Sequence, residues 1–356
     1  MADGNSYGFR RKRSTADAID ALHRLLSRKD SPVWILEGDI KGCFDYISHE
    51  WLLGNVQIDK SILRKWLKCG VVFNKILSPT EQGTPQGGII SPTLANATLD
   101  GMEKMINEKY CKQYMGKGKF YCPKVNLVRY ADDFVVTADK RETLDDIRIL
   151  LTDFLSERGL SLSEEKTLIT NISEGFDFLG FNVRKYNGKL LIKPSKKSIK
   201  KMTEKLHEVV FSHKAVAQNV LIGLLNPVIT GWGNYFRHVV SKEVFSKIDY
   251  ILNGQLKRWA YRRHPKKSKT WVVDKYFKSD GRRKWCFMQK VKEADTITTS
   301  VLKNLADIPI IRHVKIKKDA NPFDSAWDAY FEERRMKRLR FSRTLRRRQL
   351  VGFVPA

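Results

Sequence analysis

Short continuous apolar runs, set between segments with helically spaced apolar residues, mark the first half of the chain. Residues 33–39 (VWILEGD) form a short apolar run with a β-branched start, which predicts a buried strand ending in a carboxylate. Residues 124–138 predict a β-hairpin, because two apolar runs flank a tight turn that contains two aspartates. A second hairpin is predicted from strands at 176–183 and 189–192, joined by an Asn-Gly turn.

Helical spacing of apolar residues occurs in four segments, 14–26, 49–73, 93–110 and 144–158. Ser14 begins the first segment with Asp17 three residues on, an imperfect capping box. The Gly- and Pro-rich stretch 78–92 predicts a loop. After Pro194 the pattern changes to apolar helical stripes bordered by lysines. We therefore expect a mixed helix-and-sheet domain to about residue 193, a basic helical domain to about 270 and a less regular basic region beyond.

Charge is divided unevenly between the two halves of the chain. Residues 1–180 hold 25 basic and 25 acidic side chains, whereas residues 181–356 hold 41 basic and 14 acidic ones, which accounts for the whole net charge of +27. A field of that size attracts polyanions, so nucleic acid is the first candidate partner and an anionic membrane surface the second. The membrane is the weaker candidate, because neither long uncharged stretch is an apolar span of about 20 residues.

Cysteine usage and the N-terminal segment both indicate an intracellular setting. The five cysteines are scattered without a C-x-x-C pair, which favours neither a zinc site nor a disulfide framework. Residues 1–13 lack the apolar core of a signal peptide.

Three aspartates end predicted strands: Asp39, Asp132 and Asp133. They can converge above one sheet, and their oxygens suit Mg²⁺. Two such ions can activate a 3′-hydroxyl and stabilise a leaving pyrophosphate. An Asp pair at a turn is also ordinary turn chemistry, but the flanking apolar strands favour a catalytic role.

Two further segments carry candidate chemistry. Residues 82–97 (QGTPQGGIISPTLANA) hold glycines that let backbone N–H groups approach a ligand, although most loops of this composition are only loops. Lys166 in SLSEEKT can serve as a point charge or proton donor beside a phosphate, or is simply a surface lysine.

Six segments, in this order, resemble the successive blocks of reverse transcriptases, specifically those encoded by group II introns: YGFRRKRSTADAI, ILEGDIKGCFD, QGTPQGGIISPTLAN, RYADDFVV, GLSLSEEKT and FDFLGF. Further on, LLNPVITGWGNYFRHV and KIDYILNGQLKRWAYRRH resemble the maturase or thumb domain of that family. NPFDSAWDAYFEER resembles the segment before its DNA-binding and endonuclease region. The resemblance covers almost the whole chain.

The fold implied by the resemblance is the α+β right-hand polymerase. Residues 1–193 would form a partial fingers region and a palm, in which helices pack on an antiparallel sheet. Residues 194–270 would form an α-helical thumb or maturase domain. Residues 271–356 would be a basic region that could be the remnant of a DNA-binding domain.

Roles for individual residues also follow from the resemblance. Two Mg²⁺ ions, with Mn²⁺ as a substitute, would be bound at Asp39, Ile40, Asp132 and Asp133. Phe44 falls at the steric gate, where its ring would crowd a ribose 2′-hydroxyl and favour dNTPs; without the family it could equally be a core residue. The other residues implied in nucleotide binding are Arg10, Arg13, Gln86 and Lys166. The primer grip would be Phe178, Leu179 and Gly180.

Aromatic and basic residues mix in the second half, a combination that suits RNA binding by stacking and phosphate neutralisation. Trp232 and Phe236 are better explained as core of the thumb. The cations expected to contact RNA are Lys197, Lys200, Lys201, Arg237, Lys257, Arg258, Arg262 and Arg263. Residues 334–348 hold nine basic residues and would be either a nucleic-acid arm or a solvated tail.

The implied function is RNA-directed DNA polymerisation, in which dNTPs extend a DNA primer on an RNA template, together with binding of group II intron RNA as a maturase. The alternatives are a non-catalytic RNA-binding maturase or remnant that assists splicing, and a defence-associated reverse transcriptase. The chain starts at the second family block and carries no paired cysteines near its end. Either the chain is a truncated copy, which puts polymerase activity of this chain alone in doubt, or a second chain or a dimer supplies the first fingers block. We expect no endonuclease domain. The family setting is the bacterial cytoplasm, with an organelle as the alternative.

Overall fold

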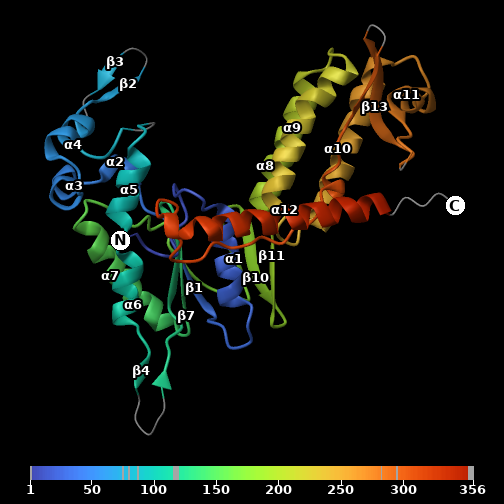
Figure 1. Cartoon of the computed structure of the whole chain (residues 1–356). Helices are drawn as coiled ribbons and strands as arrows, with labels where there is room; N and C mark the ends of the chain where they lie inside the picture. The colour runs from blue at the N-terminus through green and yellow to red at the C-terminus, as the bar shows by residue number, and fades with distance from the viewer. Residues whose placement is uncertain are drawn as a thin grey trace. The chain divides into compact units, whose positions relative to one another are not determined.

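The computed structural model describes residues 2–73, 76–78, 81–85, 88–114, 120–281, 283–293 and 296–351. The chain divides into two compact units (Figure 1). The first comprises Met1–Leu179, Val183–Leu191 and His313–Arg338, and the second comprises Gly180–Asn182, Ile192–Arg312 and Leu339–Ala356. The domain boundaries expected near residues 193 and 270 stay predictions; by packing, the second unit runs on to Arg312.

An antiparallel four-stranded sheet is the centre of the first unit. Its order is β6-β7-β1-β8, with β1 at Trp34–Gly38, β6 at Asn126–Tyr130, β7 at Asp133–Ala138 and β8 at Leu168–Asn171. The predicted strand and the first predicted hairpin are therefore both present. Their apolar residues, among them Leu36, Phe134 and Val136, are buried in one hydrophobic core.

Helices surround this sheet: α1 (Thr15–Leu26), α2 (Cys43–Tyr46), α3 (His49–Asn55), α4 (Lys60–Leu67), α5 (Ser91–Leu99), α6 (Met102–Lys109) and α7 (Arg141–Ser156). Both α1 and α6 contact β6, and α7 contacts β7 and β1. Two short hairpins extend from the unit, β2 (Val71–Phe73) with β3 (Ile76–Ser78) and β4 (Gln113–Tyr114) with β5 (Phe120–Tyr121). The mixed α+β architecture expected from the sequence is confirmed.

Three predicted elements are interrupted, each for a local reason. The helix expected over 49–73 is the pair α3 and α4, because the Asp59 carboxylate caps α4 by accepting from two backbone N–H groups. The helix expected over 93–110 breaks at Gly101, which has a φ of 103°. The strand expected over 176–183 is split into β9 (Phe176–Phe178) and β10 (Phe181–Tyr186), because Leu179 and Gly180 between them both have positive φ.

The second unit is helical, as expected, but it also contains a sheet. Its helices are α8 (Lys196–Ser212), α9 (Gln218–Phe236), α10 (Lys242–Arg263) and α11 (Lys269–Tyr276), and β11 (Lys189–Pro194) leads into them. The sheet β12-β13-β14 was not predicted; its strands are Phe277–Lys278, Cys286–Glu293 and Thr296–Val301. Packing of β13 and β14 against α9 supports these polar strands. The short η1 (Leu305–Asp307) packs on α10.

Aromatic rings form part of the core of this helical unit. The ring centroids of Trp232 and Phe236 lie 4.5 Å apart, and those of Trp232 and Phe245 lie 5.7 Å apart. Phe236 is only 3% exposed. Phe236 therefore has the core role expected of it, and the half-buried Trp232 packs against it.

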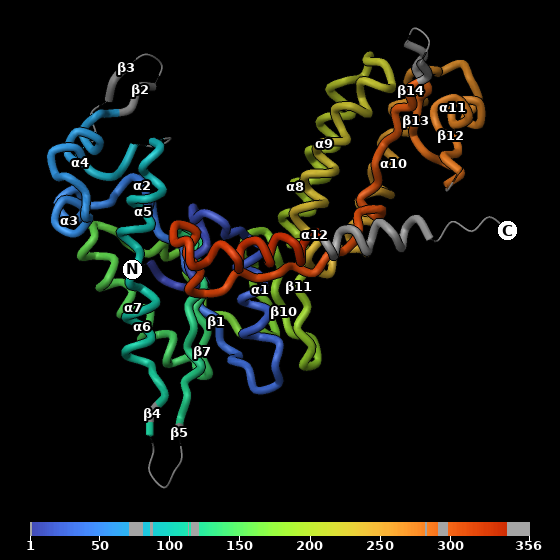
Figure 2. Tube along the Cα trace, in the orientation of Figure 1, coloured from blue at the N-terminus to red at the C-terminus, as the bar shows by residue number. Residues whose placement is uncertain are grey.

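The segment His313–Arg338 returns to the first unit (Figure 2). It contains η2 (Ser325–Trp327) and the start of α12 (Asp328–Val351). Its anchor is Asp17, which is fully buried and accepts hydrogen bonds from His313 Nε2 at 2.9 Å, Ile316 N at 2.8 Å and an Arg334 guanidinium nitrogen at 2.6 Å. Arg334 is thus a structural residue of this unit. Among the described helices, none is both long and apolar enough to cross a membrane.

Candidate active site

The register of the sheet brings the three aspartates together. Gly38, the last residue of β1, pairs with Phe134 of the antiparallel β7. Asp39 therefore leaves β1 at the point where Asp133 enters β7, with Asp132 in the turn just before it. Gly38 is required because a Cβ there would lie 2.1 Å from the Phe134 ring.

A buried arginine holds the turn that carries two of these aspartates. Arg129, fully buried in β6, donates to Asn96 Oδ1 at 3.0 Å, Asp100 Oδ1 at 2.7 Å and the Ala131 carbonyl at 3.3 Å. Ala131 has a φ of 58°, a left-handed conformation that is unfavourable for alanine and needs such support. Sequence reasoning missed this role, although an arginine within an apolar strand was a usable signal.

The N-terminal segment supports the same turn from the edge of the sheet. Tyr7 N donates to the Arg129 carbonyl at 2.9 Å. A Cβ on Gly8 would lie 2.3 Å from Ala131 N, so only glycine fits against the turn. Phe9 follows with a φ of 54° and is 54% exposed, and its ring meets Phe44 edge-on at a centroid distance of 6.1 Å. Phe9 was not among the predicted site residues.

Lys166 is brought to Asp39 by a short antiparallel pairing. Ser163 N donates to the Asp39 carbonyl at 2.8 Å, and Ile40 forms a bridge with Leu162. In the turn that follows, Lys166 Nζ lies 2.9 Å from Asp39 Oδ2. Lys166 is thus both an exposed lysine and the ion-pair partner of a candidate catalytic group.

Several predicted site residues line one pocket of about 260 Å³: Asp39, Ile40, Phe44, Asp132 and Lys166. Burial is the main cause that raises the pKa of Asp133 to about 6, and the charges of Asp132 and Asp39 add to it. Burial also raises the pKa of Asp132. The hydrogen bond to Asp39 raises the pKa of Lys166, which stabilises its ammonium form.

The donor chemistry of this cluster fits a hard divalent cation. Carboxylates that ionise reluctantly beside one another gain from a cation that neutralises them. As they stand, no three Asp, Glu, His or Cys side chains among the described residues are arranged as a ready metal site, and Lys166 holds one oxygen of Asp39. A metal ion that binds Oδ2 of Asp39 would therefore displace Lys166 from it.

The remaining predicted nucleotide contacts are not gathered at this pocket. Arg10 donates to the Asp3 carbonyl at 2.6 Å, and Arg13 donates to the Lys318 carbonyl at 2.7 Å. Gln86 lies outside the described residues. The roles of these three residues stay predictions.

The predicted primer grip forms a tight turn between β9 and β10. Phe178 is 5% exposed, whereas Leu179 and Gly180 have φ values of 51° and 80°. The Gly180 carbonyl accepts a hydrogen bond from Ser195 N at 2.9 Å. The turn is therefore well defined, and its contact with a primer stays a prediction.

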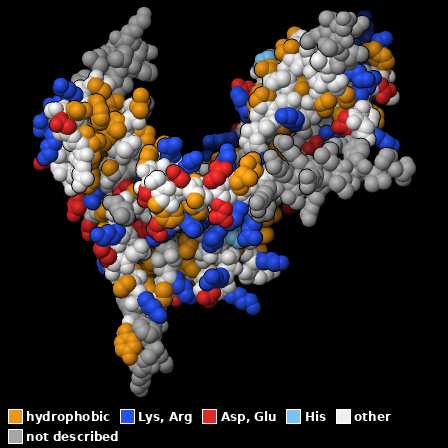
Figure 3. Space-filling model, viewed as in Figure 1, with side chains coloured by type: hydrophobic (Ala, Val, Ile, Leu, Met, Phe, Trp, Pro, Cys, Tyr) orange, Lys and Arg blue, Asp and Glu red, His pale blue; other side chains and the backbone are white. Residues whose placement is uncertain are grey.

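The predicted RNA-binding cations differ in how available they are. The exposed ones are Lys197, Lys200, Lys201, Arg258 and Arg262. Lys257 and Arg237 are half-buried, and Arg237 donates to Asn234 Oδ1 at 3.0 Å. Arg263 donates to the carbonyls of Lys214 and Val216. Lysine and arginine side chains are spread over the visible face of the second unit (Figure 3).

Two family models match the chain, one in each half. Residues 1–183 match the reverse transcriptase (RNA-dependent DNA polymerase) family, and residues 199–277 match the group II intron maturase-specific domain. The chain therefore belongs to the reverse transcriptase family, in its group II intron-encoded reverse transcriptase and maturase branch.

Curated relatives agree with this assignment. The group II intron-encoded protein LtrA of Lactococcus lactis subsp. cremoris is 29% identical over 280 residues, which covers 60% of this chain and 46% of LtrA. The protein YkfC of Escherichia coli K12 is 30% identical, covering 49% of this chain and 54% of YkfC. The chain thus spans about half the length of these relatives. Among solved structures, apo telomerase from Candida tropicalis aligns at 15% identity and a TM-score of 0.41, covering 72% of this chain and 46% of the telomerase.

Proposed function

We propose that this chain is an RNA-directed DNA polymerase of the group II intron type. It would add dNTPs to the 3′-hydroxyl of a DNA primer paired with an RNA template. The observation that carries the proposal is the convergence of Asp39, Asp132 and Asp133 at one end of the sheet, beside a pocket that Phe44 and Lys166 also line.

Each residue of the cluster has a part that follows from its chemistry. Asp39, Asp132, Asp133 and the backbone of Ile40 would hold two Mg²⁺ ions. Bound there, the ions would lower the pKa of the primer hydroxyl and neutralise the leaving pyrophosphate. Asp133 must lose its proton to serve as a ligand, which its pKa of about 6 allows at neutral pH. Phe44 would fill the space of a ribose 2′-hydroxyl, and Lys166 would turn from Asp39 to a substrate phosphate.

The second candidate function is maturase activity, the binding of intron RNA without polymerisation. Residues 192–312 support it, because they hold 26 basic and nine acidic side chains. A surface with that excess neutralises phosphates regardless of the state of the aspartates. Completion of the fingers by a second chain or a dimer stays a prediction under either function.

Primer extension on an RNA template with dNTPs and Mg²⁺ tests the first candidate. We would compare wild type with Asp132→Ala/Asp133→Ala and with the control Asp145→Ala/Asp146→Ala, an adjacent aspartate pair on α7. If wild type and the Asp145→Ala/Asp146→Ala control extend the primer and the Asp132→Ala/Asp133→Ala variant does not, the result supports the polymerase. Extension by the Asp132/Asp133 variant at the wild-type rate refutes it. RNA binding by all three proteins without extension by any of them favours the maturase.

A further inference from the structure

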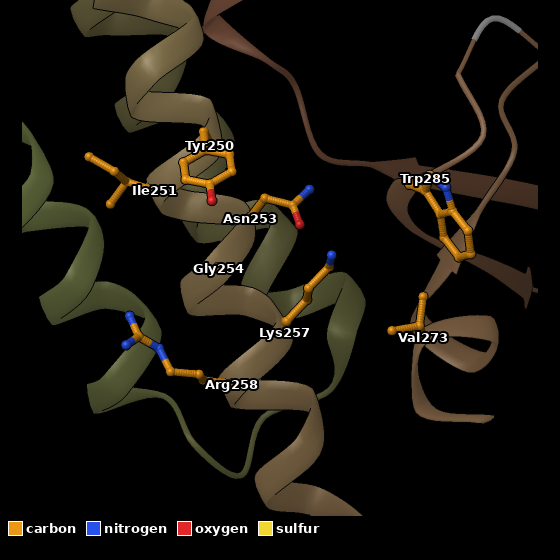
Figure 4. Close-up of a pocket in the computed structure, with 8 residues that line it drawn as sticks. All are labelled: Tyr250, Ile251, Asn253, Gly254, Lys257, Arg258, Val273 and Trp285. Carbon is orange, nitrogen blue, oxygen red and sulfur yellow. The ribbon is translucent and has the colours of Figure 1, made fainter. Parts of the chain in front are cut away.

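A pocket of about 780 Å³ lies in the second unit, between α10 and the segment that precedes β13. Tyr250, Asn253, Gly254 and Lys257 line it from α10, and Trp285 lines it from the opposite side. In Figure 4, Asn253 and Lys257 extend from α10 toward the side where Trp285 lies, whereas Arg258 extends away from it. The wall of the pocket thus combines two aromatic rings, one amide and one cation.

The two aromatic residues are unusually exposed. Tyr250 is 82% exposed and Trp285 is 56% exposed, although the unit has a well-packed aromatic core. Tyr250, Asn253 or Gly254, and Lys257 follow one another at spacings of three and four residues, so they share one face of α10. The apolar stripe of α10, which includes Phe245, Leu252 and Trp259, is buried on another face. The exposed face of α10 is therefore distinct from the face that packs in the core.

Gly254 adds depth to the pocket without a structural need for glycine. It lies within α10, where glycine costs about 1 kcal/mol relative to alanine. A Cβ at this position would meet nothing within 4 Å, so no neighbour excludes a side chain. The space above Gly254 is therefore open to a ligand.

The charge around the pocket selects the class of ligand. Residues 192–312 carry a net charge of +17. A ligand that suits both this field and two exposed rings has anionic groups and flat apolar groups, which describes a nucleotide whose base is unstacked. Asn253 supplies a donor and an acceptor for the edge of such a base. A base within a duplex cannot reach the rings, because both of its faces are already stacked.

We propose that this pocket binds an unpaired nucleobase of an RNA strand, with the base against Trp285 and the adjoining phosphate at Lys257. The proposal rests on the RNA-binding part of the proposed function and is independent of polymerisation. With such a pocket, the basic surface would bind single-stranded or bulged RNA more tightly than a continuous duplex.

Fluorescence anisotropy tests the proposal with two labelled probes. One is a mixed-sequence single-stranded RNA about 20 nucleotides long, and the other is its perfect duplex. Trp285→Ala removes one ring, and Gly254→Leu fills the pocket. The matched controls are Trp271→Ala, a 40% exposed tryptophan on α11, and Gly231→Leu, a glycine of α9 with nothing within 4 Å of its Cβ position. Circular dichroism and thermal unfolding establish that each variant is folded.

Loss of the stacking partner should weaken single-strand binding about tenfold. We expect this loss in Trp285→Ala and Gly254→Leu, with duplex binding changed less than about twofold and both controls unchanged. The salt dependence should stay the same in these variants, because it counts neutralised phosphates, whereas Lys257→Ala should reduce its slope by about one.

Two results overturn the proposal, and they are distinguishable. If folded Trp285→Ala and Gly254→Leu bind the single strand as wild type does, or lose single strand and duplex equally, the pocket does not bind a base. If wild type binds neither probe, the RNA-binding part of the proposed function fails together with the pocket. Failure of primer extension alone leaves the result of this assay intact.

Discussion

Replacing Asp133 by asparagine should stabilise the protein in the absence of metal ions. Burial, with the charges of Asp132 and Asp39, raises the pKa of Asp133 from 3.8 to about 6. In the pH range between these values, the folded protein holds a proton that the unfolded chain has released. The stability of the folded protein therefore falls as the pH rises through that range. At neutral pH the ionised Asp133 carboxylate destabilises the folded protein by its full amount.

The magnitude follows from the size of the shift. A difference of about two pKa units corresponds to about 3 kcal/mol. Because Asp133 is only partly buried, screening by solvent reduces the expected gain to about 1–2 kcal/mol. For a domain of about 200 residues, this is a rise in Tm of about 3–6 °C.

Thermal unfolding of wild type and Asp133→Asn in EDTA, at about pH 7.5, 6 and 4.5, measures this gain. The advantage of the variant should shrink toward the lowest pH, where the wild-type carboxyl of the folded protein is protonated and therefore neutral like the asparagine. Asp146→Asn, an exposed aspartate of α7, is the control and should show no such trend. Mg²⁺ should raise the Tm of wild type more than that of Asp133→Asn. A variant that is less stable than wild type at pH 7.5, or a gain that does not depend on pH, refutes the reasoning.

The remaining predictions concern anchoring and nucleotide selection. Arg334→Ala should lower the free energy of unfolding by about 3–5 kcal/mol, because it removes a partner of the buried Asp17. The control Arg335→Ala, at an exposed position, should change it by less than about 0.5 kcal/mol. Chemical denaturation measures both values. Phe44→Ala should raise incorporation of NTPs relative to dNTPs by about tenfold or more in primer extension, and an unchanged ratio would exclude Phe44 as the gate. Phe9→Ala should shift the same ratio in the same direction but by less, because the Phe9 ring only abuts Phe44.

Local pattern predicted the centre of the first unit well. The strand that ends at Asp39 and the hairpin with two aspartates were readable because their apolar runs are short, continuous and bounded by turn residues. Their antiparallel pairing then follows from the register between Gly38 and Phe134, which sequence alone did not supply. The helix breaks at Asp59 and Gly101 were not predicted, because the helical spacing of apolar residues continues across both positions. The breaks depend instead on the cap that Asp59 forms and on the positive φ of Gly101.

Long-range pairing lies beyond what local pattern can predict. Asp17 has the spacing of a capping box with Ser14, yet its carboxylate binds Arg334, which is 317 residues away in the chain. Arg334 in turn belongs to a basic run whose composition suggested an arm or a tail. Nothing within either segment indicates that it has the other as a partner.

Two aspartates of the same unit show why the cluster at the end of the sheet is better explained by cation binding than by turn chemistry. Burial favours the neutral form of Asp17, but hydrogen bonding to His313 and the charge of Arg334 outweigh it and lower its pKa to about 2. For Asp133 the charge of Lys166 lowers the pKa too little to offset burial and the charges of Asp132 and Asp39, and the pKa rises to about 6. A carboxylate that stabilises a fold is neutralised by partners within that fold, as Asp17 is. The three aspartates have one lysine, Lys166, bound to Asp39, so a cation from outside the chain would supply the neutralising charge that they lack, as expected of a metal-binding site.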